Sequence, residues 1–136
     1  MLERIISKRL TFFFDKNKLF SDCQFGFRKS YNTELAVIDI YEKLLKNLDE
    51  RLSSCAIFLD LAKAFDTVNH DILIRKLSKY GIRGSALQML DSYLSSRKQF
   101  VSIDNVNSET AIIELGVPQG LILGPFLFLI FINDLP

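Results

Sequence analysis

The feature that most constrains the fold is an apolar run near the end of the sequence, LILGPFLFLIFI at residues 121–132. Twelve residues are too few to span a bilayer, because a membrane-spanning helix needs roughly twenty. The run therefore predicts a helix buried in a protein core, with Gly124 and Pro125 in its first turn, where proline costs least. A chain of 136 residues, 49% of them hydrophobic, is long enough to form one such core.

Apolar spacing elsewhere predicts an α+β domain with more helix than strand. Steps of three and four residues indicate four further helices, at residues 1–17, 33–50, 70–80 and 85–94. Gly81 is expected to end the third of these helices. Side-chain caps are expected at the N-terminal ends of the second, third and fourth of these helices, from Asn32, from either Thr67 or Asn69, and from Ser85.

Strand signals are fewer than helix signals. The short apolar run CAIFLDL indicates a central strand at residues 53–61. Residues 98–103 alternate as KQFVSI and are expected to form a hairpin with residues 110–115, and residues 116–120 a tight loop. No repeat or linker divides the sequence, so we expect one domain.

Charge and cysteine content narrow the classes of protein only partly. The net charge is +1, but residues 1–31 hold seven basic against three acidic residues, and residues 72–98 hold six against one. Two basic stretches could line a groove for a polyanion, although charged runs are more often solvated faces. Cys23 and Cys55 form no metal-binding pair, and two cysteines favour reduced thiols in an intracellular protein, in the nucleus or the cytoplasm.

An aspartate closes the predicted central strand. Asp60 ends the run AIFLD, and a carboxylate at a strand end can ligate Mg²⁺ in a cleft, although such an aspartate is more often a turn or cap residue. Asp66 follows six residues later, about 20 Å away in an extended chain, so the two are poor candidates for one metal-binding pair. Asp66 is expected to be a local hydrogen-bond acceptor, and His70, the one histidine, a structural residue.

Three stretches together resemble a known family. FLDLAKAFDTVNH is similar to the motif that opens the palm of reverse transcriptases from non-LTR retrotransposons of the long interspersed element type. GVPQGLILGPFLFLIFINDLP resembles the next palm block, and QFGFRKSYNTELAV, preceded by LERIISKRL, resembles the fingers block. The resemblance divides the chain into fingers-like residues 1–52 and a partial palm at residues 53–136.

The resemblance implies roles for residues of the first palm motif. Asp60 would be the catalytic aspartate that holds Mg²⁺, together with the backbone carbonyl of Leu61. Phe65 would be the aromatic steric gate that excludes a ribose 2′-hydroxyl, although composition alone favours a core phenylalanine.

Further roles follow from the other two blocks. Gln119 and Gly120 would meet the incoming nucleotide and the template, and Arg28 would contact a triphosphate or a template phosphate. The family typically has a small hydroxyl residue after PQG, whereas this sequence has Leu121, which would crowd the substrate path.

The implied reaction is RNA-templated DNA synthesis, with an RNA template, a DNA primer, deoxynucleotides and Mg²⁺, and without a membrane partner. The F/Y-A-D-D box, which carries the family's remaining catalytic aspartates, is expected after INDLP and is not among the 136 residues. We therefore expect a fragment that does not polymerise by itself. Two alternatives remain: a non-catalytic remnant that binds nucleic acid, and an inert relic of poor solubility.

Overall fold

The computed structural model describes residues 2–135 and has an α+β fold that is mostly helical, as predicted. The helices in that range are α1 (Leu2–Lys16), α2 (Thr33–Asp49), α3 (His70–Lys79), α4 (Gly84–Leu94) and α5 (Leu123–Ile132). The strands are short and antiparallel: β1 (Arg97–Gln99), β2 (Ser102–Ile103), β3 (Val106–Asn107) and β4 (Ala111–Ile113).

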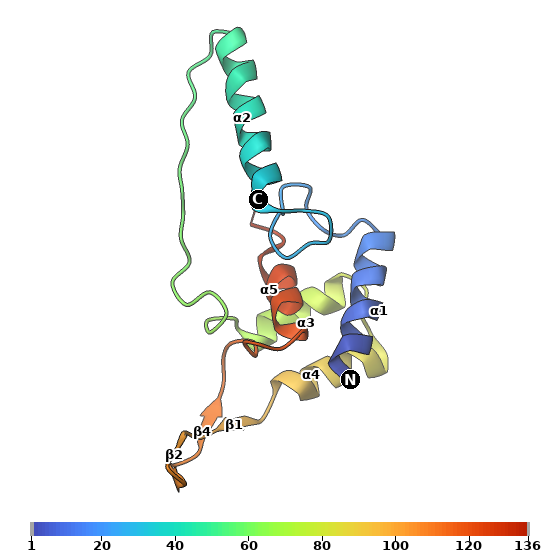
Figure 1. Cartoon of the computed structure of the whole chain (residues 1–136). Helices are drawn as coiled ribbons and strands as arrows, with labels where there is room; N and C mark the ends of the chain where they lie inside the picture. Colours follow the sequence, from blue (N-terminus) through green and yellow to red (C-terminus); the bar gives the residue numbers. More distant parts are fainter. Residues whose placement is uncertain (1, 136) are drawn as a thin grey trace.

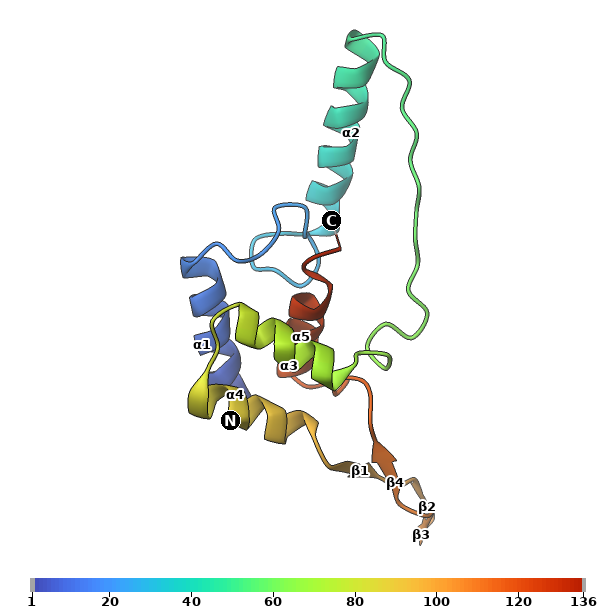
Figure 2. The same cartoon turned by 180° about the vertical axis from the view of Figure 1, so that it is seen from behind.

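The core forms around α5, which α1 and α3 contact, while α4 packs against α3 (Figures 1 and 2). Seven of the ten residues of α5 are buried, as expected of a helix with almost no polar position. Gly124 and Pro125 lie in its first turn, as predicted. Within residues 2–135, no helix combines the length and the apolar character needed to cross a bilayer.

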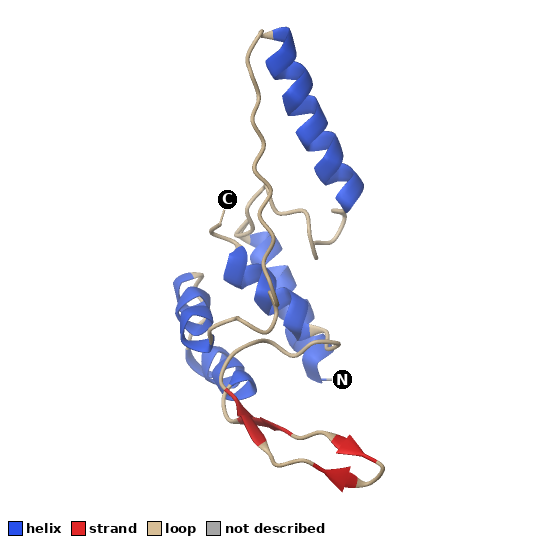
Figure 3. Ribbon diagram, turned by 90° about the vertical axis from the view of Figure 1, so that its left-hand side faces the viewer, coloured by secondary structure: helices blue, strands red, loops and turns tan. Residues whose placement is uncertain are grey.

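A hairpin projects from the helices (Figure 3) and confirms the predicted pairing for β1 and β4, whereas β2 pairs with β3 and not with residues 110–115. Arg97 of β1 lies opposite Ile113 of β4, and β2 pairs with β3 at the tip. Asp104 and Asn105 join β2 to β3 with φ angles of 47° and 61°. Two left-handed residues in a two-residue loop match the twist of the flanking strands, and Asp and Asn tolerate that conformation well.

The predicted central strand at residues 53–61 is wrong. This segment is extended but pairs with no strand in the part of the chain that the structure describes, and it returns from the tip of α2 as an open connection (Figure 1). Ile57, Phe58 and Leu59 are 82–88% exposed. A strand is defined by its partner, so β-branched and aromatic residues without one leave an extended chain with unpaired backbone groups.

Helix α2 is also separated from the core. Its helical period was predicted correctly, but none of its residues is buried. The Asn32 cap is confirmed, since its Oδ1 accepts from Leu35 N at 2.8 Å. Asn69 caps α3, and Gly81 follows that helix with φ +98°. The Ser85 cap is wrong: α4 begins at Gly84 with Arg83 at the N-cap, and the Arg83 side chain makes no capping hydrogen bond.

Candidate functional site

The stretch AFDTVNH (residues 64–70) lies against the loop GVPQG (residues 116–120, the PQG loop), although about 50 residues separate them. Val117 N donates to the carbonyl of Phe65 at 2.8 Å, and Gly116 N donates to the carbonyl of Val68 at 2.7 Å. Gly116 has φ +90°, and a Cβ there would lie 2.9 Å from Cα of Asp66. Only glycine allows two backbones to approach this closely in that conformation.

A hydrogen bond between two side chains crosses this junction. Gln119 Nε2 donates to Asp66 Oδ1 at 2.7 Å, and both side chains line a surface pocket beside the loop. Arg97 and Leu121 line the same pocket. Asp66 was expected to bond only to its sequence neighbours, and that expectation is wrong, because folding brings the PQG loop within its reach.

Phe65 is half-buried at the edge of the core. Its ring centroid lies 4.5 Å from that of Phe128 on α5 and 5.7 Å from that of Phe27. The ring is therefore held between an aromatic residue of the core and one of the loop at residues 18–31. This packing against the core is what composition alone favours for Phe65, and the steric gate remains a prediction.

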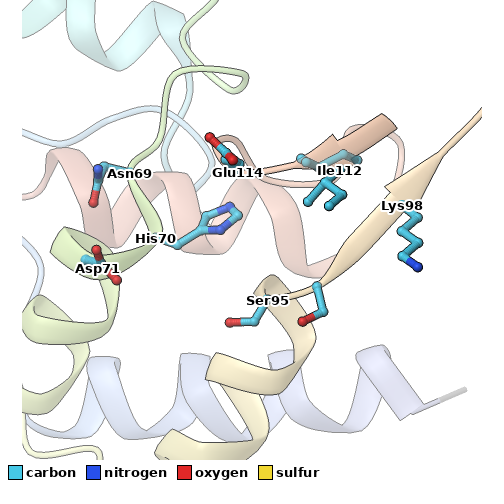
Figure 4. A pocket seen from close by; sticks show the side chains of 9 residues that line it. Asn69, His70, Asp71, Ser95, Lys98, Ile112 and Glu114 are labelled. Carbon is cyan, nitrogen blue, oxygen red and sulfur yellow. The ribbon is translucent and has the colours of Figure 1, made fainter. Parts of the chain in front are cut away.

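His70 ties the start of α3 to the same loop. Its Nε2 lies 2.7 Å from the carbonyl oxygen of Gly116. A carbonyl only accepts, so Nε2 carries the proton. Figure 4 shows the ring beside a polar pocket that Asp71, Lys98 and Glu114 also line. A structural role, as expected from the sequence, accounts for this contact.

Asp60 lies elsewhere. It is exposed at the end of the extended segment and lines a pocket with Leu61, Lys76 and Asp134, not the pocket lined by Gln119. The structure therefore brings Asp66, rather than Asp60, to the PQG loop. Asp60 and Asp66 line different pockets, in keeping with the spacing argument.

Arg28 organises the loop that contains it. Its Nη1 donates to the carbonyls of Ser21 at 2.8 Å and Gln24 at 3.3 Å. Its guanidinium carbon lies 4.1 Å from the ring centroid of Tyr31 and 5.3 Å from that of Phe20. Stacking and carbonyl contacts hold the side chain half-buried in the loop at residues 18–31, whereas contact with a phosphate remains a prediction.

The sequence matches the family model described as reverse transcriptase (RNA-dependent DNA polymerase) over residues 1–136. The chain belongs to the reverse transcriptase family. The probable RNA-directed DNA polymerase from transposon BS of Drosophila melanogaster is 36% identical over 98% of this chain. The polymerase from mobile element jockey of Drosophila funebris is 35% identical over all of it. A Pol polyprotein from the type-1 retrotransposable element R2 of Popillia japonica is 27% identical over 99% of it.

This reverse transcriptase chain spans about 15% of the length of the transposon BS and jockey polymerases, and 19% of the R2 polyprotein. The matches run through all three stretches, so their resemblance to this family is confirmed.

The donors around Asp60 fit Mg²⁺ in chemical type but are few. Mg²⁺ takes oxygen ligands, often one or two carboxylates with several waters, and Asp60 and the Leu61 carbonyl supply such oxygens. Among residues 2–135, no three His, Cys, Asp or Glu side chains gather as a metal-binding group. Asp134 lines the same pocket but is paired with Lys76, whose charge opposes a cation there.

Two polar residues that were not predicted from the sequence, Glu3 and Asn133, form hydrogen bonds with segments around the PQG loop and α5. Glu3 accepts from Tyr93 Oη at 2.8 Å and from the backbone N of Ile122 at 3.3 Å, just after the PQG loop. Burial, followed by this hydrogen bond, raises the pKa of Tyr93 to about 12. Asn133 is buried and bonds to Ser21, Leu19 and Tyr80, so it ties α5 to the loop after α1. Nothing local in the sequence marks either residue.

The PQG loop rests on α5 at Gly124, where an added Cβ would lie 2.1 Å from the carbonyl oxygen of Pro118. We expect Gly124→Ala to destabilise the fold by about 1–3 kcal/mol, because the clash is with backbone and outweighs the gain in helix propensity. Gly26→Ala is the control, since its nearest neighbour would be a side-chain atom at 3.4 Å. Urea denaturation measures both, and equal midpoints would contradict the prediction.

The ion pair between Lys76 and Asp134 makes stability depend on pH. The Lys76 hydrogen bond holds the pKa of Asp134 below its ordinary value of 3.8. A carboxyl with a lowered folded-state pKa stabilises the fold above its unfolded pKa, and this contribution is lost as pH falls through the folded pKa. Because Asp134 is 61% exposed, we expect Asp134→Asn to cost under about 1 kcal/mol at pH 7.

The cost of Asp134→Asn should shrink as the pH falls below 3.8 and vanish below the lowered pKa of the folded state, where the wild-type carboxyl is also neutral. Urea denaturation from pH 7 downward measures this difference, with exposed Asp49→Asn as the control. A difference that stays constant with pH would refute the assignment.

Proposed function

We propose that residues 1–136 form part of the fingers, at residues 1–52, and the first half of the palm, at residues 53–136, of an RNA-directed DNA polymerase. The observation that carries the proposal is the close apposition of the Phe65–Asp66 turn and the PQG loop. It joins, in one fold, two stretches that match the family. Its substrates would be an RNA template, a DNA primer and deoxynucleotides, inside the cell.

Each candidate residue has a place in this proposal. Asp60 and the Leu61 carbonyl would hold Mg²⁺, which supplies charge stabilisation to phosphoryl transfer when bound. The Phe65 ring would exclude a 2′-hydroxyl. Gln119 and Gly120 would meet the nucleotide and template, and the open space around Gly120, with φ +77°, leaves room for such an approach.

Basic residues on both sides of the PQG loop support contact with a polyanion. Arg97, from the second basic stretch, lines the pocket that contains Gln119. Arg4, from the first stretch, lines a neighbouring pocket with Gly120 and Leu121.

The same placement of basic residues favours a second candidate function, nucleic-acid binding without catalysis. Salt-dependent binding of an RNA–DNA duplex that Asp60→Ala leaves unchanged, without synthesis in the experiment below, would favour it.

A chimaera tests the polymerase proposal. Residues 1–136 would replace the aligned 136-residue segment of the jockey polymerase of Drosophila funebris. We expect Mg²⁺-dependent extension of a DNA primer on an RNA template, and none from the 136-residue polypeptide alone. Leu121→Ser in the chimaera is the matched variant that removes the crowding expected of Leu121, which is 43% exposed beside Gln119.

The unmodified jockey polymerase is the positive control for this assay. A folded chimaera that makes no DNA, with Leu121 and with Ser at position 121, would contradict the proposed function. Synthesis by the 136-residue polypeptide alone would instead contradict the expectation that its catalytic carboxylates are incomplete.

A further inference from the structure

We propose that Asp66 is a positioning residue whose carboxylate fixes the orientation of the Gln119 side-chain amide for a nucleotide. The inference rests on the proposed function and extends it to a residue that the family resemblance did not assign. Asp66 acts through Gln119 and is not itself expected to contact the nucleotide.

The chemistry of the two groups determines how the amide is turned. An ionised carboxylate only accepts hydrogen bonds, so the amide must present its NH₂ group to Asp66, as the 2.7 Å contact between Nε2 and Oδ1 records. Oε1 of Gln119 is therefore directed away from the carboxylate. It becomes an acceptor for a donor group of the ligand, such as a sugar hydroxyl, and the opposite amide orientation would present a donor instead.

Both ends of this bond stand on backbone that is firmly held. Val117, two residues before Gln119, donates to the Phe65 carbonyl, and Pro118 is buried against Gly124. After Gln119 the support ends: Gly120 has no neighbour within 4 Å of an added Cβ, and Leu121 is 43% exposed. Asp66 is therefore the tether for the one side chain of the loop that the family resemblance assigns to the nucleotide.

The hydrogen bond between Asp66 and Gln119 contributes more to the orientation of the Gln119 amide than to the stability of the fold. Asp66 and Gln119 are both exposed, so water competes for each group and the net stabilisation of the fold is small. A glutamine side chain has several freely rotating bonds, and holding it in one rotamer before binding removes an entropic cost from ligand recognition. A side chain that is preorganised in this way should have distinct amide NMR signals at Gln119.

Side-chain amide NMR of the ¹⁵N-glutamine-labelled 136-residue chain tests the contact. The side-chain signals of exposed Gln88 are the internal references, because this side chain makes no hydrogen bond among residues 2–135 and, unlike Gln99, does not line the pocket with Asp66 and Gln119. Gln119→Glu identifies the Gln119 signals by their loss. We expect the Gln119 amide protons to be shifted from the references in wild type and to join them in Asp66→Ala.

Two further variants separate positioning from general effects. Asp66→Asn keeps an acceptor oxygen at the same place, so the Gln119 shift should be largely restored. Glu114→Ala removes an exposed carboxylate two residues before Gly116 and should leave the shift unchanged. Gln119 signals that coincide with the references in wild type, or that respond equally to Asp66→Ala and Glu114→Ala, would overturn the inference.

Titration of the same samples with a deoxynucleoside triphosphate and Mg²⁺ tests the purpose of the contact. We expect the Gln119 signals to respond, with roughly three- to tenfold weaker apparent affinity in Asp66→Ala, corresponding to one lost hydrogen bond. An unchanged affinity in Asp66→Ala, or no response of Gln119 in wild type, would overturn the positioning role. The chimaera assay decides the proposed function separately, so the two failures are distinguishable.

Discussion

Asp60→Ala is expected to lower the rate of primer extension by the jockey chimaera about a thousandfold. A carboxylate that holds a catalytic metal contributes several kcal/mol to transition-state stabilisation, and each 1.36 kcal/mol corresponds to a factor of ten. Single-turnover extension of a DNA primer on an RNA template measures the rate, so that slow product release does not mask the chemical step.

The chimaera, rather than the 136-residue chain, is used for this experiment because Asp60 lies away from the PQG loop. Its segment, residues 53–61, has no strand partner among residues 2–135, and Asp60 lines a different pocket from Gln119. Asp49→Ala, which removes an exposed carboxylate from the end of α2, is the matched control and should leave the rate unchanged. If Asp60→Ala keeps more than a tenth of the activity, the metal-binding role fails.

Phe14→Ala is expected to destabilise the 136-residue chain by about 3–5 kcal/mol. Phe14 is fully buried, and its ring centroid lies between 4.9 and 5.9 Å from the ring centroids of four aromatic neighbours, Phe13, Phe20, Tyr80 and Phe126. Truncation would leave a cavity where α1, α3 and α5 meet. Since a domain of this size is stable by only about 5–15 kcal/mol, much of its stability would be lost.

Phe12→Ala is the control in the same helix, because Phe12 is 68% exposed and should change stability by no more than about 0.5 kcal/mol. Urea denaturation followed by circular dichroism at a helix wavelength compares the two variants. Similar midpoints for Phe12→Ala and Phe14→Ala would show that α1 is not docked on the core as described.

Exposed apolar surface remains outside this core. α2 buries no residue, and Ile57, Phe58 and Leu59 lie almost wholly in solvent. Such a surface favours association in solution.

Local patterns in the sequence predicted much of this fold. The helical periods of α1 to α4, the cap at Asn32, the choice of Thr67 or Asn69 to cap α3, and the hairpin around Asp104 and Asn105 all follow from neighbours within a few residues. The order of the three motifs along the sequence likewise predicted the family. These features depend on backbone dihedral preferences and short-range hydrogen bonds, which adjacent residues determine.

Contacts between distant segments were decided by the tertiary structure alone. Residues 53–61 have the composition of a strand but lack a strand partner within residues 2–135, and no local pattern reveals whether one is present. Asp66, rather than Asp60, meets Gln119 across 53 residues, since close packing of Gly116 on the Phe65–Asp66 turn brings the loop there. A side chain's partner depends on which backbones pack together, and that is a property of the whole core rather than of any stretch of sequence.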